Sequence, residues 1–349
     1  MRRPTIVGQF AHRGFWPRVW SRLWLPAVPT YSTSNWTKNR EALGFLVSTA
    51  FVVLAAIRDV VLGGLVQRAS PLFVATTAFT LCTLLLLPIA FVRSRNSLAT
   101  LLRRPRDLFW VNVASMLAYL AFLFALKFIE PTLVQILYSG IGPLSVLWIE
   151  NRFSPAHRRT PISPRERRVY VGLLATLLFA ASVALLGFSG TGRLPPAVAA
   201  GGVVLGVGGG IAVSVATMLC RRLNDHGVSA GALLALRFPG TAVVAAVLEW
   251  LSPDAALPLP ASLDYLLLIA LLLIVTASYV NQFAISLASP LTVRVVLASG
   301  PVLIFLFQLI EGRLSASPYT LTAAVLYAVA AITAGIARQR AIQTKASTG

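Results

Sequence analysis

The stretch ALKFIEPTLVQILYSG, residues 125–140, closes one apolar run and opens the next at Pro131. The stretch AISLASPLTVRVVLAS, residues 284–299, repeats the pattern 159 positions later and carries Pro290 where the first carries Pro131. Because proline punctuates helices, both copies predict a boundary between two apolar segments. The chain therefore contains an internal repeat, and this repeat determines the fold that we expect.

The composition around this repeat is that of a membrane protein. Of 349 residues, 57% are hydrophobic and only 12% are charged, whereas soluble domains carry about 25% charged residues. Apolar runs of near twenty residues recur, each long enough to cross a hydrocarbon core of about 30 Å. A β-barrel would show short alternating segments instead. The class expected is an all-α polytopic membrane protein.

Ten apolar runs are predicted to span the membrane. They cover roughly residues 43–66, 72–92, 109–129, 132–149, 169–188, 198–220, 230–249, 263–285, 291–310 and 319–337. Five runs fall in each copy of the repeat, and the same shift aligns Ser70 with Ser229 and Phe79 with Phe238. An odd number of spans makes the second copy enter the membrane in the opposite sense, so two inverted five-helix repeats are predicted.

The domain boundaries follow from these runs. A basic segment precedes the first repeat and a short tail follows the second, which gives 1–42, 43–188, 198–338 and 339–349. Within 1–42, Trp16, Trp20 and Trp24 recur at helical spacing, which is typical of a helix lying in the headgroup layer. A disordered basic tail and an organellar transit peptide are the alternatives for this segment.

The net charge of +19 would indicate nucleic-acid binding in a soluble protein. Here the placement of the charge gives it another meaning. With the N-terminus inside, the cytoplasmic segments hold 23 Lys and Arg residues and the outer segments hold four. Positive residues favour the cytoplasmic side, so both termini are expected in the cytoplasm. No nucleic-acid partner is expected.

Several residue types exclude other functions. Cys82 and Cys220 fall inside apolar runs, which argues against a disulfide or zinc site. The three histidines lie outside the runs, so no span offers the partner of a catalytic serine. No metal site, cofactor, nucleotide-binding motif or enzymatic activity is expected. Gly202, Gly206 and Gly210 recur at intervals of four and predict close helix packing.

Polar residues gather on single faces of three predicted spans. The fourth span carries Gln135, Tyr138, Ser139 and Gly142, the third carries Asn112, Ser115 and Tyr119, and the eighth carries Tyr279 and Gln282. At spacings of three and four residues, such side chains share one helix face. We expect these faces to line a shared central cavity that binds substrate. Ordinary hydrogen bonding between helices is the alternative.

Apart from Lys127, Glu249 and Asp264 at span ends, the charged residues within the predicted spans are Arg58, Asp59, Arg237 and Arg294. Each costs roughly 2.5–3.5 kcal/mol at a span centre, so such residues normally face a wet cavity. Arg58 and Asp59 lie about 100° apart on a helix, so each is expected to pair with another span. Their surplus positive charge favours an anionic or zwitterionic solute held by its carboxylate. Asp59 is the candidate to carry a coupling proton.

Two further pairs are candidates at helix ends. Glu150 and Glu311 each close a span beside an arginine, which predicts terminal salt bridges or, alternatively, gating. Pro143 lies inside the fourth span and Pro301 inside the ninth, and both are further candidates for a gating or helix-end role.

A resemblance to a known family rests on several motifs. These are SPLFVATTAF; FALKFIEPTLVQIL followed by GPL and IENRFS; LALRFP; and FAISLASPLTVRVV followed by GPVL and IEGRLS. Over about residues 43–338 the chain resembles the drug/metabolite transporter superfamily, EamA type. The resemblance implies a ten-span inner-membrane carrier, of a kind that often exports amino acids or other metabolites. Ala78, aligned with Arg237, departs from strict repetition.

The function expected is secondary active transport, as an exporter of a small metabolite such as an amino acid or related organic anion or zwitterion, by alternating access. A proton-coupled exporter of cationic drugs is the first alternative, and an intramembrane enzyme, channel or scaffold the next. The expected partners are a small-molecule substrate, protons and the lipid bilayer. The sequence leaves the oligomeric state open between monomer and homodimer.

Overall fold

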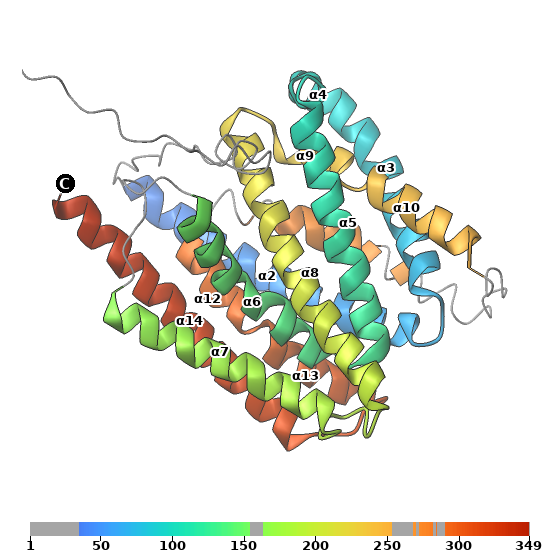
Figure 1. The fold of residues 1–349 in the computed structure, drawn as a ribbon. Coiled ribbons are helices and arrows are strands. Elements are labelled where there is room, and N and C mark those ends of the chain that lie inside the picture. The colour runs from blue at the N-terminus through green and yellow to red at the C-terminus, as the bar shows by residue number, and fades with distance from the viewer. Residues whose placement is uncertain are drawn as a thin grey trace, which may run out of the picture.

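In a computed structural model, the chain is a bundle of helices (Figure 1). The structure describes residues 35–153, 163–252, 268–269, 272–281, 284 and 290–348, and contains no strand among them. The helices are α2 (Asn35–Val66), α3 (Pro71–Arg93), α4 (Arg95–Leu102), α5 (Pro105–Phe128), α6 (Pro131–Phe153), α7 (Pro164–Leu185), α8 (Pro196–Asp225), α9 (Ala230–Arg237), α10 (Pro239–Trp250), Leu272–Asn281, α12 (Pro290–Ala298), α13 (Gly300–Glu311) and α14 (Pro318–Thr348).

Proline and serine define where many of these helices begin. Eight of the helices named above have proline as their first residue, where its missing N–H costs nothing. The Ser70 hydroxyl caps α3 by accepting a hydrogen bond from the Phe73 amide at 3.4 Å, and Ser229 caps α9 from Ala232 at the same distance. The boundary predicted at Pro131 is confirmed, because α5 ends at Phe128 and α6 begins at Pro131.

Eight helices in the described residues are long and apolar enough to cross a membrane. Their bounds match eight of the predicted runs, so the protein is a multi-pass membrane protein by this criterion. The predicted run 291–310 is instead two shorter helices, α12 and α13, on either side of Ser299, because Pro301 supplies no amide donor. The run 263–285 lies largely outside the described residues, as does the tryptophan pattern of 1–42. The short helix α4 was not predicted.

Small residues bring three helices into close contact. α8 packs against α5 and α6. A Cβ at Gly202 would lie 2.8 Å from Ile129, one at Gly206 would lie 3.3 Å from Leu137, and one at Gly210 would overlap the Tyr138 backbone. The predicted role of the glycine stripe in close packing is therefore confirmed, with α8 as the helix that carries it.

The remaining helices pair along the flanks of the bundle. α7 lies beside α14 on one flank and α3 beside α10 on another, while α2 contacts α12 and α13 (Figure 1). At the start of α3, Ser70 donates a hydrogen bond to Glu249 near the end of α10 at 2.5 Å. Beyond the other end of α3, Ser97 contacts the Gly227 carbonyl that precedes α9. α3 therefore runs antiparallel to α9 and α10.

The outward faces of these helices are apolar. More than a third of the surface of many large apolar side chains is exposed, among them Leu84, Leu178, Val204, Val243 and Leu306. Exposed leucine and valine on this scale would be unfavourable in water, whereas lipid accepts them. The two cysteines, Cys82 and Cys220, are free and buried.

Candidate functional site

Arg58 and Asp59 form an ion pair within α2. The Arg58 Nε donates a hydrogen bond to Asp59 Oδ1 at 2.8 Å, and Nη2 lies 2.7 Å from the same oxygen. Asp59 is 0% exposed, and its Oδ2 atom has no hydrogen-bond partner among the described residues. The expectation that each residue pairs with another span is wrong, because the long arginine side chain bends back to its neighbour. One carboxylate oxygen nevertheless has no hydrogen-bond partner in the part of the chain that the structure describes.

A small cavity opens beside Arg58, between α2, α3, α5 and the helix Leu272–Asn281. Its walls are mostly apolar and include Phe79, Phe122 and Ile274, while Arg58 and Tyr119 supply the polar groups. In this conformation the cavity has a volume of about 20 Å³, room for about one water molecule, so a solute would fit only after the surrounding helices move apart. Of the predicted site residues, Arg58 and Tyr119 are the two that line it.

Arg237 also lies against Tyr119. Its guanidinium carbon is 5.8 Å from the Tyr119 ring centroid and 5.7 Å from that of Phe238, within the range of cation–π attraction. Its Nε donates a hydrogen bond to the Ser115 hydroxyl at 2.7 Å. Arg237 is only 8% exposed and makes no salt bridge with any residue that the structure describes. This cation is therefore buried without an anionic partner in the described part of the chain.

Arg237 is the last residue of α9, at a break before Pro239. The break leaves the Leu236 carbonyl and the Gly240 amide, four residues apart, without their helical bond. Asn112 of α5 fills the gap, since its Nδ2 donates to Leu236 at 2.8 Å and its Oδ1 accepts from Gly240 at 3.0 Å. A side chain inserted in this way bends a helix without leaving polar groups unsatisfied. Asn112, predicted to line a cavity, thus holds the helix break beside Arg237.

Three aromatic rings join the cavity to Arg237. The ring centroids of Phe79 and Tyr119 are 5.0 Å apart, those of Phe79 and Phe238 are 5.1 Å apart, and those of Tyr119 and Phe238 are 5.4 Å apart. These contacts link α3, α5 and the break between α9 and α10 at one level of the bundle. Arg58 lines the cavity together with Phe79 and Tyr119, and Arg237 contacts the rings of Tyr119 and Phe238.

The polar face predicted on α6 reaches this region through Tyr138, whose ring packs against Phe122 at 4.9 Å. Gln135 and Ser139 are half-buried on the same helix. Tyr279 does not line the cavity and is 54% exposed. Gln282 lies outside the described residues.

At the helix ends, the predicted salt bridge of Glu311 is confirmed, with Arg313 Nε 3.1 Å from its carboxylate. Pro143 lies within α6, and Pro301 is buried in the first turn of α13. The side chains of Glu150 and Arg294 lie outside the described residues.

Glu130 was not among the predicted site residues, although it is 1% exposed and bonded to three donors. A signal existed in the sequence, because Glu130 is the only acid between residues 108 and 149. No cluster of His, Cys, Asp or Glu side chains suited to a metal ion occurs in the described ranges.

Comparison with known proteins supports the fold alone. No protein-family model matches the sequence, and no curated protein matches it. Eleven chains of solved structures are similar. One, described only as a crystal structure of a protein, superimposes with a TM-score of 0.58 at 19% sequence identity, over 86% of this chain and 99% of that chain. The likeness to the drug/metabolite transporters therefore stays a prediction from the sequence.

Proposed function

We propose that the protein is a secondary active transporter that exports small amino-acid-like solutes by alternating access. The observation that carries this proposal is the buried Arg237, which has no anionic partner among the described residues and shares Tyr119 with the cavity of Arg58. A buried charge is costly unless it is paired. A solute carboxylate would supply the missing anion, in the bidentate geometry that a guanidinium favours.

The solute class follows from a second unsatisfied group. Asp59 Oδ2 is a buried acceptor without a partner in the described chain. Asp59 does not itself line the cavity, so a solute ammonium group would reach this oxygen in a conformation that opens the site further. The apolar cavity walls at Phe79 and Phe122 suit a hydrophobic solute side chain. An apolar α-amino carboxylate therefore fits this set of groups better than a solute of a single charge.

An inverted repeat of two five-helix halves is part of this proposal. Ser70 and Ser229, which the repeat aligns, cap α3 and α9 in the same way. Phe79 and Phe238, also aligned, stack on each other, as equivalent residues beside a two-fold axis would. The packing of α6 against α8 has its counterpart in that of α12 and α13 against α2. These three relations support two halves that can rock against each other.

The proposed topology has ten spans and both termini in the cytoplasm of a cell with this protein in its inner membrane. In that orientation, the end of the bundle that holds Arg68, Arg193 and Arg313 faces outward. The excess of Lys and Arg in the opposite segments supports this orientation. The resemblance to EamA-type carriers agrees with it.

The experiment is uptake into everted membrane vesicles that contain the protein. Under an imposed proton gradient, wild-type vesicles should accumulate a labelled apolar amino acid, and Arg237→Gln vesicles should not. Arg193→Gln, which removes an exposed arginine outside the site, is the matched control. Accumulation of a cationic amine alone, or equal uptake by Arg237→Gln vesicles, would contradict the proposal.

A further inference from the structure

Glu130 lies in the turn between α5 and α6, outside the spans, and both its carboxylate oxygens are hydrogen bonded. Oε2 accepts from the Gly190 amide at 2.9 Å and from the Thr320 hydroxyl at 3.0 Å, and Oε1 accepts from Gln308 Nε2 at 3.1 Å. Among the described residues it makes no ion pair. Three neutral donors thus surround a buried acid that has no counter-ion there.

The direction of two of these hydrogen bonds is fixed. A backbone amide such as that of Gly190 can only donate. Gln308 Oε1 accepts from the Thr132 amide at 3.0 Å, so its Nε2 must face Glu130. The Thr320 hydroxyl can either donate or accept. A proton on Oε2 could therefore be donated to Thr320 while the other two hydrogen bonds remain. The site therefore accommodates the neutral acid as well as the carboxylate. In a Glu130→Gln variant, by contrast, the new amide NH₂ group would face one of the two fixed donors, the Gly190 amide or Gln308 Nε2.

The same carboxylate joins the two halves of the chain. Glu130 belongs to the first half, Gln308 and Thr320 belong to α13 and α14 of the second, and Gly190 lies between them. All these contacts lie at one end of the bundle, which we call the Glu130 end. Opening this end, a step that the proposed alternating access requires, would separate Glu130 from its partners and expose it to water.

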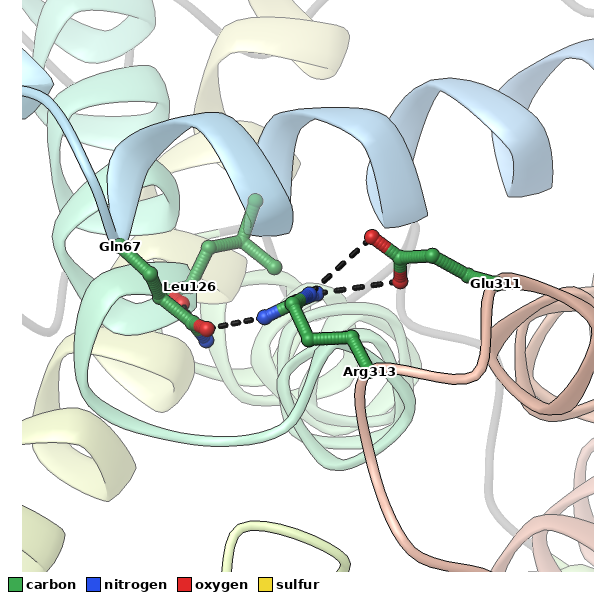
Figure 2. Close-up of polar contacts among 4 residues, drawn as sticks. All are labelled: Gln67, Leu126, Glu311 and Arg313. Atoms are coloured by element: carbon green, nitrogen blue, oxygen red, sulfur yellow. Dashed lines mark hydrogen bonds and ion pairs between the residues drawn. The ribbon is translucent and has the colours of Figure 1, made fainter.

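A second network closes the Glu130 end beside the first (Figure 2). Gln67 at the end of α2 donates to the Leu126 carbonyl at 3.2 Å and accepts a hydrogen bond from Arg313, which also pairs with Glu311. The approach is close, since a Cβ at Gly63 would lie 2.7 Å from Pro131. This network binds α2 and α5 to the segment between α13 and α14.

Burial in this closed end raises the pKa of Glu130 above its ordinary value, and the hydrogen bonds from Gly190, Thr320 and Gln308 offset only part of that effect. Charged or titratable groups of the neighbouring elements at the Glu130 end include Lys127, Arg193, Glu311, Arg313 and Tyr319. None of these five makes a hydrogen bond or salt bridge to Glu130 in the described chain.

We propose that Glu130 is a proton-binding site whose occupancy stabilises the closed Glu130 end. A group that binds protons more tightly in the closed state than in the open state favours closure at low pH. The closed state is therefore fully favoured below the ordinary glutamate pKa, and the preference is lost as pH rises through the raised pKa. Opening releases the proton to the side that the Glu130 end faces.

The test is a distance measurement by double electron–electron resonance on purified protein. Spin labels at Arg68→Cys and Ala316→Cys, both exposed and both at the Glu130 end, report its opening. Cys82→Ala and Cys220→Ala remove the native thiols. From about pH 4 to about pH 9, a range that begins near the ordinary glutamate pKa, the distance distribution should shift from short to long. Glu130→Gln should abolish this pH dependence, and Asp225→Asn, which removes an exposed carboxylate elsewhere, should retain it.

Thr320→Ala provides a second variant that keeps the acid. The Thr320 hydrogen bond lowers the Glu130 pKa, so its loss should move the midpoint of the distance change upward by about one pH unit. A wild-type distance that does not change with pH would overturn the proposal, as would an unchanged midpoint in Thr320→Ala. The measurement needs no solute. A pH-dependent opening in a protein that transports nothing would uphold the proton site and remove the carrier.

Discussion

Asp59 and Glu130 are both acids at or near zero exposure, yet their surroundings differ. Asp59 has one cationic neighbour, Arg58, which contacts one oxygen and leaves the other without a partner among the described residues. Glu130 has three neutral donors that satisfy both oxygens and no cation in the described chain. We call the Asp59 site incomplete because one oxygen has no partner in the described chain, and the Glu130 site complete because both oxygens accept hydrogen bonds.

The difference separates two uses of a buried acid. Among the described residues, Asp59 has one oxygen without a partner and Arg237 has no anionic partner. A solute can supply both missing partners. A complete set cannot accept a solute without breaking, so it serves to join elements and to bind a proton. Buried polar groups need partners in both cases, and the partner is what differs.

The largest expected effect comes from breaking the Arg58–Asp59 pair. Arg58→Met leaves Asp59 buried with no cationic partner among the described residues and should reduce the free energy of unfolding by about 3–5 kcal/mol. Arg58→Met combined with Asp59→Leu removes both charges and should recover most of that loss. Thermal unfolding of the purified variants measures both effects. A double variant as unstable as the single would show that packing, and not charge pairing, holds these residues.

Arg237→Gln should separate stability from binding. Because a cation without an anionic partner in the described chain is removed, the free energy of unfolding should stay equal or rise. The affinity for a carboxylate solute should fall about 30-fold or more, as expected when one partner of a buried charge pair is lost. Calorimetric titration and thermal unfolding measure the two quantities. Reduced stability with unchanged affinity would make Arg237 a structural residue.

Asn112 resembles Glu130 in that its polar atoms are satisfied, although it lies close to the incomplete site. Asn112→Ala leaves the Leu236 carbonyl and the Gly240 amide without partners, which should cost about 1–3 kcal/mol of stability. Asn96→Ala, at an exposed position on α4, is the matched control. A loss no greater than that of the control would mean that the break between α9 and α10 needs no support from α5.

The smallest effect is expected at Glu311, whose carboxylate is only partly buried and pairs with Arg313. Its side chain is 30% exposed in the pair with Arg313, and exposed ion pairs contribute at most about 1 kcal/mol. Glu311→Gln should therefore change the unfolding temperature little, and less than Glu130→Gln. A larger loss at Glu311 than at Glu130 would reverse the ranking of the two networks at this end.

Much of the fold could be predicted from the sequence because it depends on local patterns. Runs of apolar residues locate eight helices to within a few residues, and the glycines of α8 indicate where it packs closely. The split between α12 and α13 was harder to predict, because the apolar run continues on both sides of Ser299 and membrane helices tolerate a proline such as Pro301.

The site was harder to predict because it depends on contacts distant in the chain. The polarity of Arg58, Tyr119 and Arg237 within apolar runs was enough to predict all three as site residues, and the structure brings them together. It could not show that Asn112 bonds backbone atoms at residues 236 and 240. Nor could it reveal Glu130, whose partners lie 60, 178 and 190 positions away.

The measurement that tests the central claim most directly is the thermal shift of purified protein with three matched solutes. An apolar α-amino acid, the same molecule without its amino group, and the same molecule without its carboxylate differ only in the charges that they present. Asp59 and Arg237 together predict that the complete amino acid raises the unfolding temperature most. Equal stabilisation by all three, or by none, would contradict a site made from these two residues.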